Sequence, residues 1–158
     1  MYKKNWKTFV LWILLTEAVG GLSALLTRDG MERYAAETIQ PPLSPPSVVF
    51  PIVWTVLYLL MGIGAAMVAL NGRGEDRKIA LWLYGGQLLF NFLWSIIFFN
   101  MRAYLVALIW IIVLWVLILL MMIYFYRVSR TAARLQIPYI LWVAFATYLT
   151  AAVFALNG

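Results

Sequence analysis

Five apolar runs constrain this chain more than any other feature of its sequence, because each is long enough to cross a lipid bilayer. A helix of about 20 residues spans the roughly 30 Å of hydrocarbon in a membrane. The runs show no strand-like alternation, and a backbone in lipid must satisfy its own hydrogen bonds, as a helix does. The sequence therefore predicts an all-α fold, an integral membrane bundle of five transmembrane helices. The runs cover residues 8–26, 48–70, 79–100, 103–126 and 135–156.

The composition leaves little material for any other domain. Hydrophobic residues make up 65% of the 158 residues and charged residues 11%, whereas soluble domains contain about 25% charged residues. We therefore expect a single membrane domain over residues 1–158. The lysines before the first run could belong to a secretory signal, but this run is longer than a signal core and contains Glu17. A retained first transmembrane helix is the favoured interpretation.

Positive charges are distributed unevenly between the two sides of the predicted bundle. Nine lysines and arginines lie on the side of the N-terminus and three on the other side. Because cytoplasmic loops are enriched in Lys and Arg, we predict a multi-pass protein of the plasma membrane with a cytoplasmic N-terminus and an external C-terminus. The net charge of +6 matches attraction to an anionic leaflet, and no nucleic-acid partner is expected. The three cations on the external side are Arg28, Arg33 and Arg102.

The residue types of common catalytic and metal sites are missing from the sequence. It contains no histidine and no cysteine, which excludes the usual zinc sites, imidazole bases and thiol nucleophiles. We predict no metal site and no obligatory cofactor. Glu17 is the only acid within a run, and an intramembrane carboxylate is a candidate functional group. A protonated Glu17, hydrogen-bonded to a neighbouring helix, is favoured over a role in proton transport.

The longest connection, residues 27–47, joins the first two runs on the predicted external side. Its first part, GMERYAAET, contains helix formers and is compatible with two helical turns. Its second part is rich in proline, which fixes φ and removes an amide donor, so a stiff and extended backbone is expected there. Loops of this length are often functional. The prolines are Pro41, Pro42, Pro45 and Pro46, with Pro51 in the first turn of the next run.

Small residues gather in the first two runs. Such residues allow helices in a membrane to approach closely, so we predict tight packing inside the bundle, with contact between two copies as the alternative. The residues are Gly20, Gly21, Ala24, Gly62, Gly64, Ala65, Ala66 and Ala69.

Tryptophan is the most distinctive residue type of this chain. Of eight tryptophans, five lie well inside the runs rather than at the membrane interfaces, where Trp usually occurs. Helical spacing places several on shared faces with polar or small residues, at depths of roughly 9–21 Å in their spans. This pattern predicts an aromatic cleft beneath the long connection, in which two amide side chains orient a ligand; ordinary helix packing is the alternative. The three stripes are Trp54 with Tyr58, Gln87 with Asn91 and Trp94, and Trp142 with Ala146.

Three segments resemble a known membrane family. They are PPSVVFPIVWTVLY (45–58), GQLLFNFLWSIIFF (86–99) and IPYILWVAFATYLTAAVFALN (137–157). With the five runs and the long first connection, they are similar to bacterial members of the translocator protein family, also called tryptophan-rich sensory proteins or peripheral benzodiazepine receptors. The resemblance implies a five-helix bundle, commonly a homodimer, that binds porphyrins. Some members also recognise sterols and synthetic benzodiazepine-site ligands.

The resemblance also implies roles for single residues. By position it assigns pocket residues at Trp54, Trp142 and Ala146 and places an asparagine typical of the family at Asn91. It further implies that the loop of residues 27–47, with Pro45 and Pro46, forms a stiff lid over the pocket.

Two positions depart from the pattern of that family. The family often has tryptophan in the loop where this chain has Pro42 and Leu43, so the resemblance supplies no tryptophan for contact between lid and ligand. The sterol-recognition pattern at the end of the last run needs Lys or Arg after Tyr148, and none follows. Sterol binding is therefore not predicted as the native role.

Three functions remain open on this basis. The leading hypothesis is a receptor or transporter-like protein that binds porphyrins and benzodiazepine-site-type hydrophobic ligands in the aromatic pocket, with porphyrin as ligand rather than cofactor. The alternative is an enzyme that degrades porphyrin in a light-dependent reaction through Trp54 and Trp142. A further alternative is a stress-regulatory or assembly protein without an obligatory ligand. The intramembrane aromatic residues favour the first hypothesis over the last.

Overall fold

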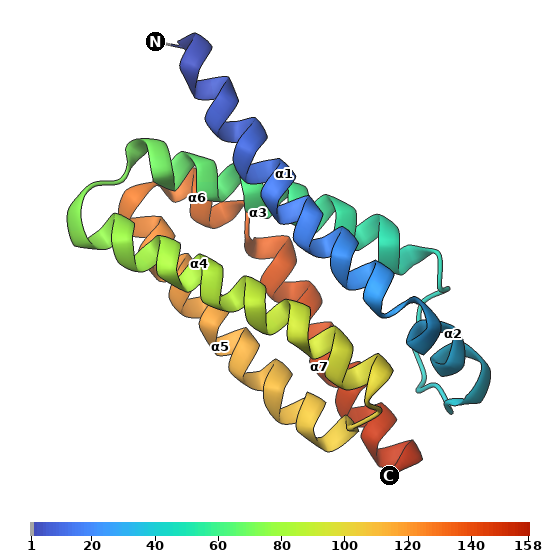
Figure 1. Cartoon of the computed structure of the whole chain (residues 1–158). Coiled ribbons are helices and arrows are strands. Elements are labelled where there is room, and N and C mark those ends of the chain that lie inside the picture. The colour runs from blue at the N-terminus through green and yellow to red at the C-terminus, as the bar shows by residue number, and fades with distance from the viewer. Residues whose placement is uncertain (1) are drawn as a thin grey trace.

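The computed structural model describes residues 2–158, whose backbone forms five long helices and no strand (Figure 1). This architecture confirms the predicted all-α bundle. Three short helices complete it: α2 (Arg28–Glu37), the π-helix η1 (Ile96–Asn100), which continues α4, and α6 (Arg130–Arg134), which precedes α7. The long helices are α1 (Tyr2–Leu26), α3 (Val49–Asn71), α4 (Gly74–Ser95), α5 (Tyr104–Val128) and α7 (Ile137–Asn157).

Apolar side chains cover the outside of the bundle, and polar ones lie in its interior. Leu11 and Leu141 are 65% and 64% exposed, whereas Gln87 and Asn91 are buried. Five segments of 22 to 28 residues are long and apolar enough to cross a membrane. This inverted polarity is expected for a protein surrounded by lipid, because polar side chains in a membrane face the interior of the bundle.

The structure extends several helices beyond the predicted limits. The prediction began the first and third spans at residues 8 and 79, but α1 begins at Tyr2 and α4 at Gly74. Hydropathy does not detect these polar ends, although Glu75 and Asp76 lie in the first turn of α4, where acidic groups favour helix formation. The segment expected as a loop before the last span contains α6, which begins where the Ser129 hydroxyl accepts a hydrogen bond from the Ala132 amide at 3.2 Å.

Glycines bring α3 into close contact with its neighbours. A Cβ atom on Gly62 would lie 2.7 Å from the Cα of Ile13 in α1, and one on Gly64 would lie 3.3 Å from the carbonyl oxygen of Ala132 in α6. Both neighbours are backbone atoms that cannot rotate away. The predicted close packing therefore occurs within the bundle at these two positions, while Gly21 faces open space.

The α1–α3 connection, residues 27–48, lies where α1 ends and α3 begins, and the C-terminal end of α7 lies at the same end of the bundle (Figure 1). We call this the connection end, and the other the opposite end. With ten residues, α2 is longer than the two helical turns that the sequence predicted. Residues 38–48 are not helical and contain a turn in which the Ser44 amide donates to the Pro41 carbonyl at 3.4 Å.

The end of the third span differs from the regular helix that the sequence predicted up to residue 100. Residues Ile96–Asn100 form the π-helix η1, in which the Met101 amide donates to the Ile96 carbonyl at 3.0 Å. A π turn contains one more residue than an α turn and is frequent at functional sites. Here it carries Phe98 and Phe99, and both rings contact Tyr34 of α2.

Candidate functional site

A cavity of about 700 Å³ lies at the connection end, enclosed by parts of α1, α2, α3, α4, η1 and α7 and, from the connection, by Gln40 and residues 44–47. Its wall is mainly apolar and aromatic. The structure brings seven of the nine predicted site residues to this wall, namely Pro45, Pro46, Trp54, Tyr58, Trp94, Trp142 and Ala146.

Two tryptophans form a right-angled corner of this wall. The ring centroids of Trp54 and Trp142 are 6.4 Å apart, and the ring planes meet at 88°. Trp54 also stacks on Tyr58, one helical turn further along α3, with centroids 5.5 Å apart and planes at 28°. On α7, Ala146 follows Trp142 by one turn, and its small side chain leaves the space in front of the corner open. The corner offers an aromatic face and an aromatic edge to one ligand.

The two remaining predicted site residues, Gln87 and Asn91, do not line the cavity. Both are buried and bonded to protein groups. The Tyr58 hydroxyl donates to Asn91 Oδ1 at 3.0 Å, Asn91 Nδ2 donates to the Tyr139 hydroxyl at 2.8 Å, and that hydroxyl donates to Gln87 Oε1 at 2.6 Å. Buried polar groups are normally paired in this way. The expected ligand-orienting amides therefore hold two tyrosines in place instead, next to Trp54, whose ring centroid lies 6.3 Å from that of Tyr139.

Four of the tryptophans inside the bundle divide into two groups by their indole nitrogens. Trp110 donates to the Phe90 carbonyl at 3.0 Å and Trp115 to the Ile140 carbonyl at 3.2 Å, and neither lines the cavity. These two link helices. In Trp94 and Trp142 the nitrogens are covered by protein and meet no acceptor among residues 2–158. Their rings contribute apolar surface to the cavity wall.

Sequence reasoning missed the part of the wall that α2 and η1 build. Tyr34 of α2 lines the cavity and lies 5.3 Å and 5.4 Å, between ring centroids, from Phe98 and Phe99. The helix formers in GMERYAAET indicated a helix at this place but not its docking, and no pattern in the sequence indicates the π turn. Burial, with the neighbouring Tyr104 as a second cause, raises the pKa of the Tyr34 hydroxyl to about 12.

Glu17 of α1 is partly buried. The hydrogen bond to a neighbouring helix that the sequence suggested does not occur among residues 2–158. Polar contact between α1 and α4 is made instead by Thr16, whose hydroxyl is hydrogen-bonded to that of Tyr84.

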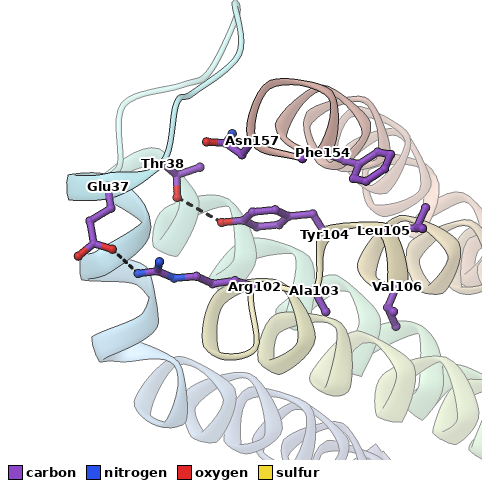
Figure 2. A pocket seen from close by; sticks show the side chains of 10 residues that line it. Glu37, Thr38, Arg102, Ala103, Tyr104, Leu105, Val106, Phe154 and Asn157 are labelled. Carbon is purple, nitrogen blue, oxygen red and sulfur yellow. Dashed lines mark hydrogen bonds and ion pairs between the residues drawn. The ribbon is translucent and has the colours of Figure 1, made fainter.

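A second, smaller cavity of about 510 Å³ lies between the end of α2, the start of α5 and the end of α7 (Figure 2). Arg102 forms an ion pair with Glu37 at its edge, and the hydroxyls of Thr38 and Tyr104 share a hydrogen bond of 3.2 Å. It shares no lining residue with the large cavity.

Five helices that are long and apolar enough to span a membrane, with an aromatic cavity at one end, define a multi-pass membrane protein with a candidate ligand site. The sequence model of the TspO/MBR family matches residues 12–156, and the chain belongs to this family. It is 37% identical over 151 residues to the tryptophan-rich protein TspO of Chlorobaculum tepidum, and the matched region covers 95% of this chain and 96% of that protein. It is 34% identical over 146 residues to the translocator protein of Bos taurus, covering 91% and 86% of the two chains.

Proposed function

We propose that this chain is a membrane receptor or transporter-like protein that binds porphyrins and similar flat hydrophobic ligands, including those of the benzodiazepine-site type. The observation that carries the proposal is the right-angled pair of Trp54 and Trp142 in the wall of the large cavity. A planar ring can stack on one indole while its edge meets the other, which are the two arrangements that aromatic rings prefer. Membership of the TspO/MBR family supports the same class of function.

The size and cover of the cavity also suit such a ligand. Its volume of about 700 Å³ lies within the range of roughly 300–1,000 Å³ that is typical of small-molecule sites. Pro45 and Pro46 of the α1–α3 connection line it, and we assign this connection the role of a lid. A segment stiffened by proline loses little conformational entropy when it closes over a ligand.

Titration of the purified protein with protoporphyrin in the dark, followed by quenching of Trp fluorescence, tests this function. Trp54→Phe and Trp142→Phe should each weaken the affinity roughly three- to tenfold, because Phe offers a smaller aromatic surface. Their melting temperatures should stay close to that of the parent.

Trp82→Phe provides the matched control, because Trp82 is 75% exposed on α4 and does not line the cavity. Parent-like affinity in all three variants would remove the aromatic corner from the binding site.

The contact of Trp54 with Tyr58 and Tyr139 favours a second candidate function, light-dependent oxidative degradation of porphyrin. Indole and phenol rings can each give up one electron, and Trp54 and Tyr58 both line this cavity. Illumination of the bound protoporphyrin distinguishes the two functions. Loss of porphyrin absorbance at a rate that depends on Trp54 supports degradation, and quenching without such loss supports binding alone.

We further infer that the protein resides in the plasma membrane as a homodimer, with a cytoplasmic N-terminus. The uneven distribution of Lys and Arg supports the orientation. Open space beside Gly85 and Gly86 of α4 supports a close helix contact between two copies. The mass of the detergent-solubilised protein tests the dimer, and Gly85→Leu should shift it toward the monomer.

A further inference from the structure

The α1–α3 connection is tied to the bundle by one asparagine that uses all of its amide hydrogen-bonding groups. Asn157, the last residue of α7, accepts from the Ile39 amide through Oδ1 at 2.9 Å. Its Nδ2 donates to the Ile39 carbonyl at 2.9 Å and to the Val153 carbonyl at 3.0 Å. The bond to Val153 fixes the amide on its own helix. The other two bonds pair with both backbone groups of Ile39, its amide and its carbonyl, as a neighbouring strand would.

Three further contacts tie the same stretch of the connection. The Tyr148 hydroxyl of α7 donates to the Pro42 carbonyl at 2.8 Å. At the start of α5, Tyr104 contacts Thr38, and just before it Arg102 contacts Glu37, as Figure 2 shows. We call this set the clasp. It consists of Arg102, Tyr104, Tyr148 and Asn157 on the bundle and Glu37, Thr38, Ile39 and Pro42 on the connection.

The clasp and the large cavity use different residues of the same short segment. None of the eight clasp residues lines the large cavity, whereas their neighbours Gln40, Ser44, Pro45 and Pro46 do. The contacts between clasp residues therefore occur away from the space that a ligand would occupy. They can change how easily the segment moves without touching that ligand.

Movement of this segment has a defined start and end. On its N-terminal side, α2 is docked on η1 through Tyr34 and Gly30. On its C-terminal side, α3 begins at Val49. Between them the hydrogen bonds and the ion pair from the segment to the bundle are those of the clasp, and all except the bond between Thr38 and Tyr104 are exposed. Local opening is easiest where contacts are few and solvent-exposed.

We propose that the clasp is a latch: it holds residues 38–46 over the large cavity, and its opening admits and releases what the cavity binds. The inference of a latch depends on the proposed function only for the identity of the ligand. Opening itself can be measured without a ligand. A latch of this kind raises both association and dissociation rates when it is weakened, whereas loss of a direct ligand contact acts mainly on dissociation.

The test uses a thiol placed inside the cavity, because the chain has no cysteine of its own. Ala146→Cys puts this thiol on a wall residue that is only 7% exposed. The rate of its reaction with a charged, membrane-impermeant thiosulfonate reagent then reports opening at the connection end. Adding Asn157→Ala should raise this rate about tenfold, the order expected when the two hydrogen bonds to Ile39 are lost. Tyr148→Phe, which removes one bond, should raise it about threefold.

Asn71→Ala is the matched control, because Asn71 ends α3 at the opposite end and makes no side-chain hydrogen bond among the described residues. Its labelling rate should equal that of Ala146→Cys alone. Melting temperatures of all variants should agree within a few degrees, which excludes general loosening of the bundle. An unchanged labelling rate in both Asn157→Ala and Tyr148→Phe would overturn the latch.

A second measurement separates failure of the latch from failure of the proposed function. In otherwise parental protein, Asn157→Ala should accelerate association and dissociation of protoporphyrin together and change the equilibrium affinity much less. Faster labelling without any protoporphyrin binding by the parent would retain the latch and reject porphyrin as the ligand. Faster dissociation with unchanged association would reject the latch and make Asn157 a contributor to ligand contact.

Discussion

Ala146 shows how one side chain sets the free space of the cavity. It lies one helical turn from Trp142 and lines the wall. A larger side chain there would project in front of the aromatic corner, and overpacking typically costs about 1–3 kcal/mol. Ala146→Leu should therefore weaken protoporphyrin binding roughly fivefold or more, measured by fluorescence titration.

Ala144→Leu is the control for this substitution, since Ala144 lies on the same helix but is exposed and does not line the cavity. If Ala146→Leu binds ligands of every size as tightly as Ala144→Leu does, α7 does not present this face to the ligand.

The raised pKa of the Tyr34 hydroxyl predicts that the docking of α2 depends on pH. Its pKa in the folded protein is about 12, above the ordinary value of 10.0. The docked state therefore holds the proton more tightly than the undocked state. Docking is fully stable below about pH 10 and loses stability as the pH rises toward about 12. The difference in tyrosinate absorbance between the parent and Tyr34→Phe should show a group that titrates near pH 12, and a midpoint near pH 10 would contradict a docked Tyr34.

Single residues also show how far sequence reasoning reaches. Trp54 with Tyr58, and Trp142 with Ala146, lie on the cavity wall as their helical spacing predicted, because that spacing fixes which residues share a face. Asn91 shares a face with Trp94 but lies buried between helices, where Tyr58 and Tyr139 use its amide. Spacing along one helix cannot reveal which partners the other helices bring.

At the scale of elements, α2 packs closely against η1 at Gly30. A Cβ atom on Gly30 would lie 2.8 Å from the carbonyl oxygen of Phe99, a backbone atom that cannot rotate away. Gly30→Ala should lift α2 and weaken protoporphyrin affinity about fivefold or more, with little change in the melting temperature, because α2 lies outside the five spans.

Gly21→Ala is a suitable comparison, since a Cβ atom there meets open space. Identical protoporphyrin affinities for these two alanine variants would show that the packing of α2 against η1 does not shape the cavity.

The proline segment carries a prediction of its own. Replacing Pro45 and Pro46 by glycine frees the backbone of the proposed lid, at about 0.4–1 kcal/mol for each position. Protoporphyrin affinity should fall roughly three- to thirtyfold, mainly through faster dissociation. The ligand-free protein should melt nearly as before. A parental dissociation rate would mean that the prolines only guide the chain into α3.

Elements that depend on apolar runs were predictable from the sequence, and elements that depend on contacts between distant residues were not. Long apolar runs located all five spans, because hydropathy is a direct consequence of the lipid environment. The π turn of η1 and the docking of α2 were not predictable, since they depend on contacts between Gly30, Tyr34 and residues about 65 positions later in the chain. Local propensity contains no information on such contacts.

At the scale of the whole molecule, the proposed orientation is open to a direct labelling test. Glu32→Cys on α2 and Glu75→Cys at the start of α4 replace exposed acids at opposite ends of the bundle. In intact cells, a membrane-impermeant thiol reagent should label only Glu32→Cys. Glu75→Cys should become reactive after permeabilisation. The reverse pattern would invert the orientation derived from Lys and Arg.

The clasp joins the connection to the bundle largely through main-chain atoms, the amide and carbonyl of Ile39 and the carbonyl of Pro42. A bond to the main chain does not depend on which side chain the residue carries. Ile39 itself is 60% exposed, so its identity is nearly free. If the latch operates as proposed, mutations at Gln40, which lines the cavity, would over evolutionary time change which molecules enter while the bonds of the clasp to the main chain are inherited intact.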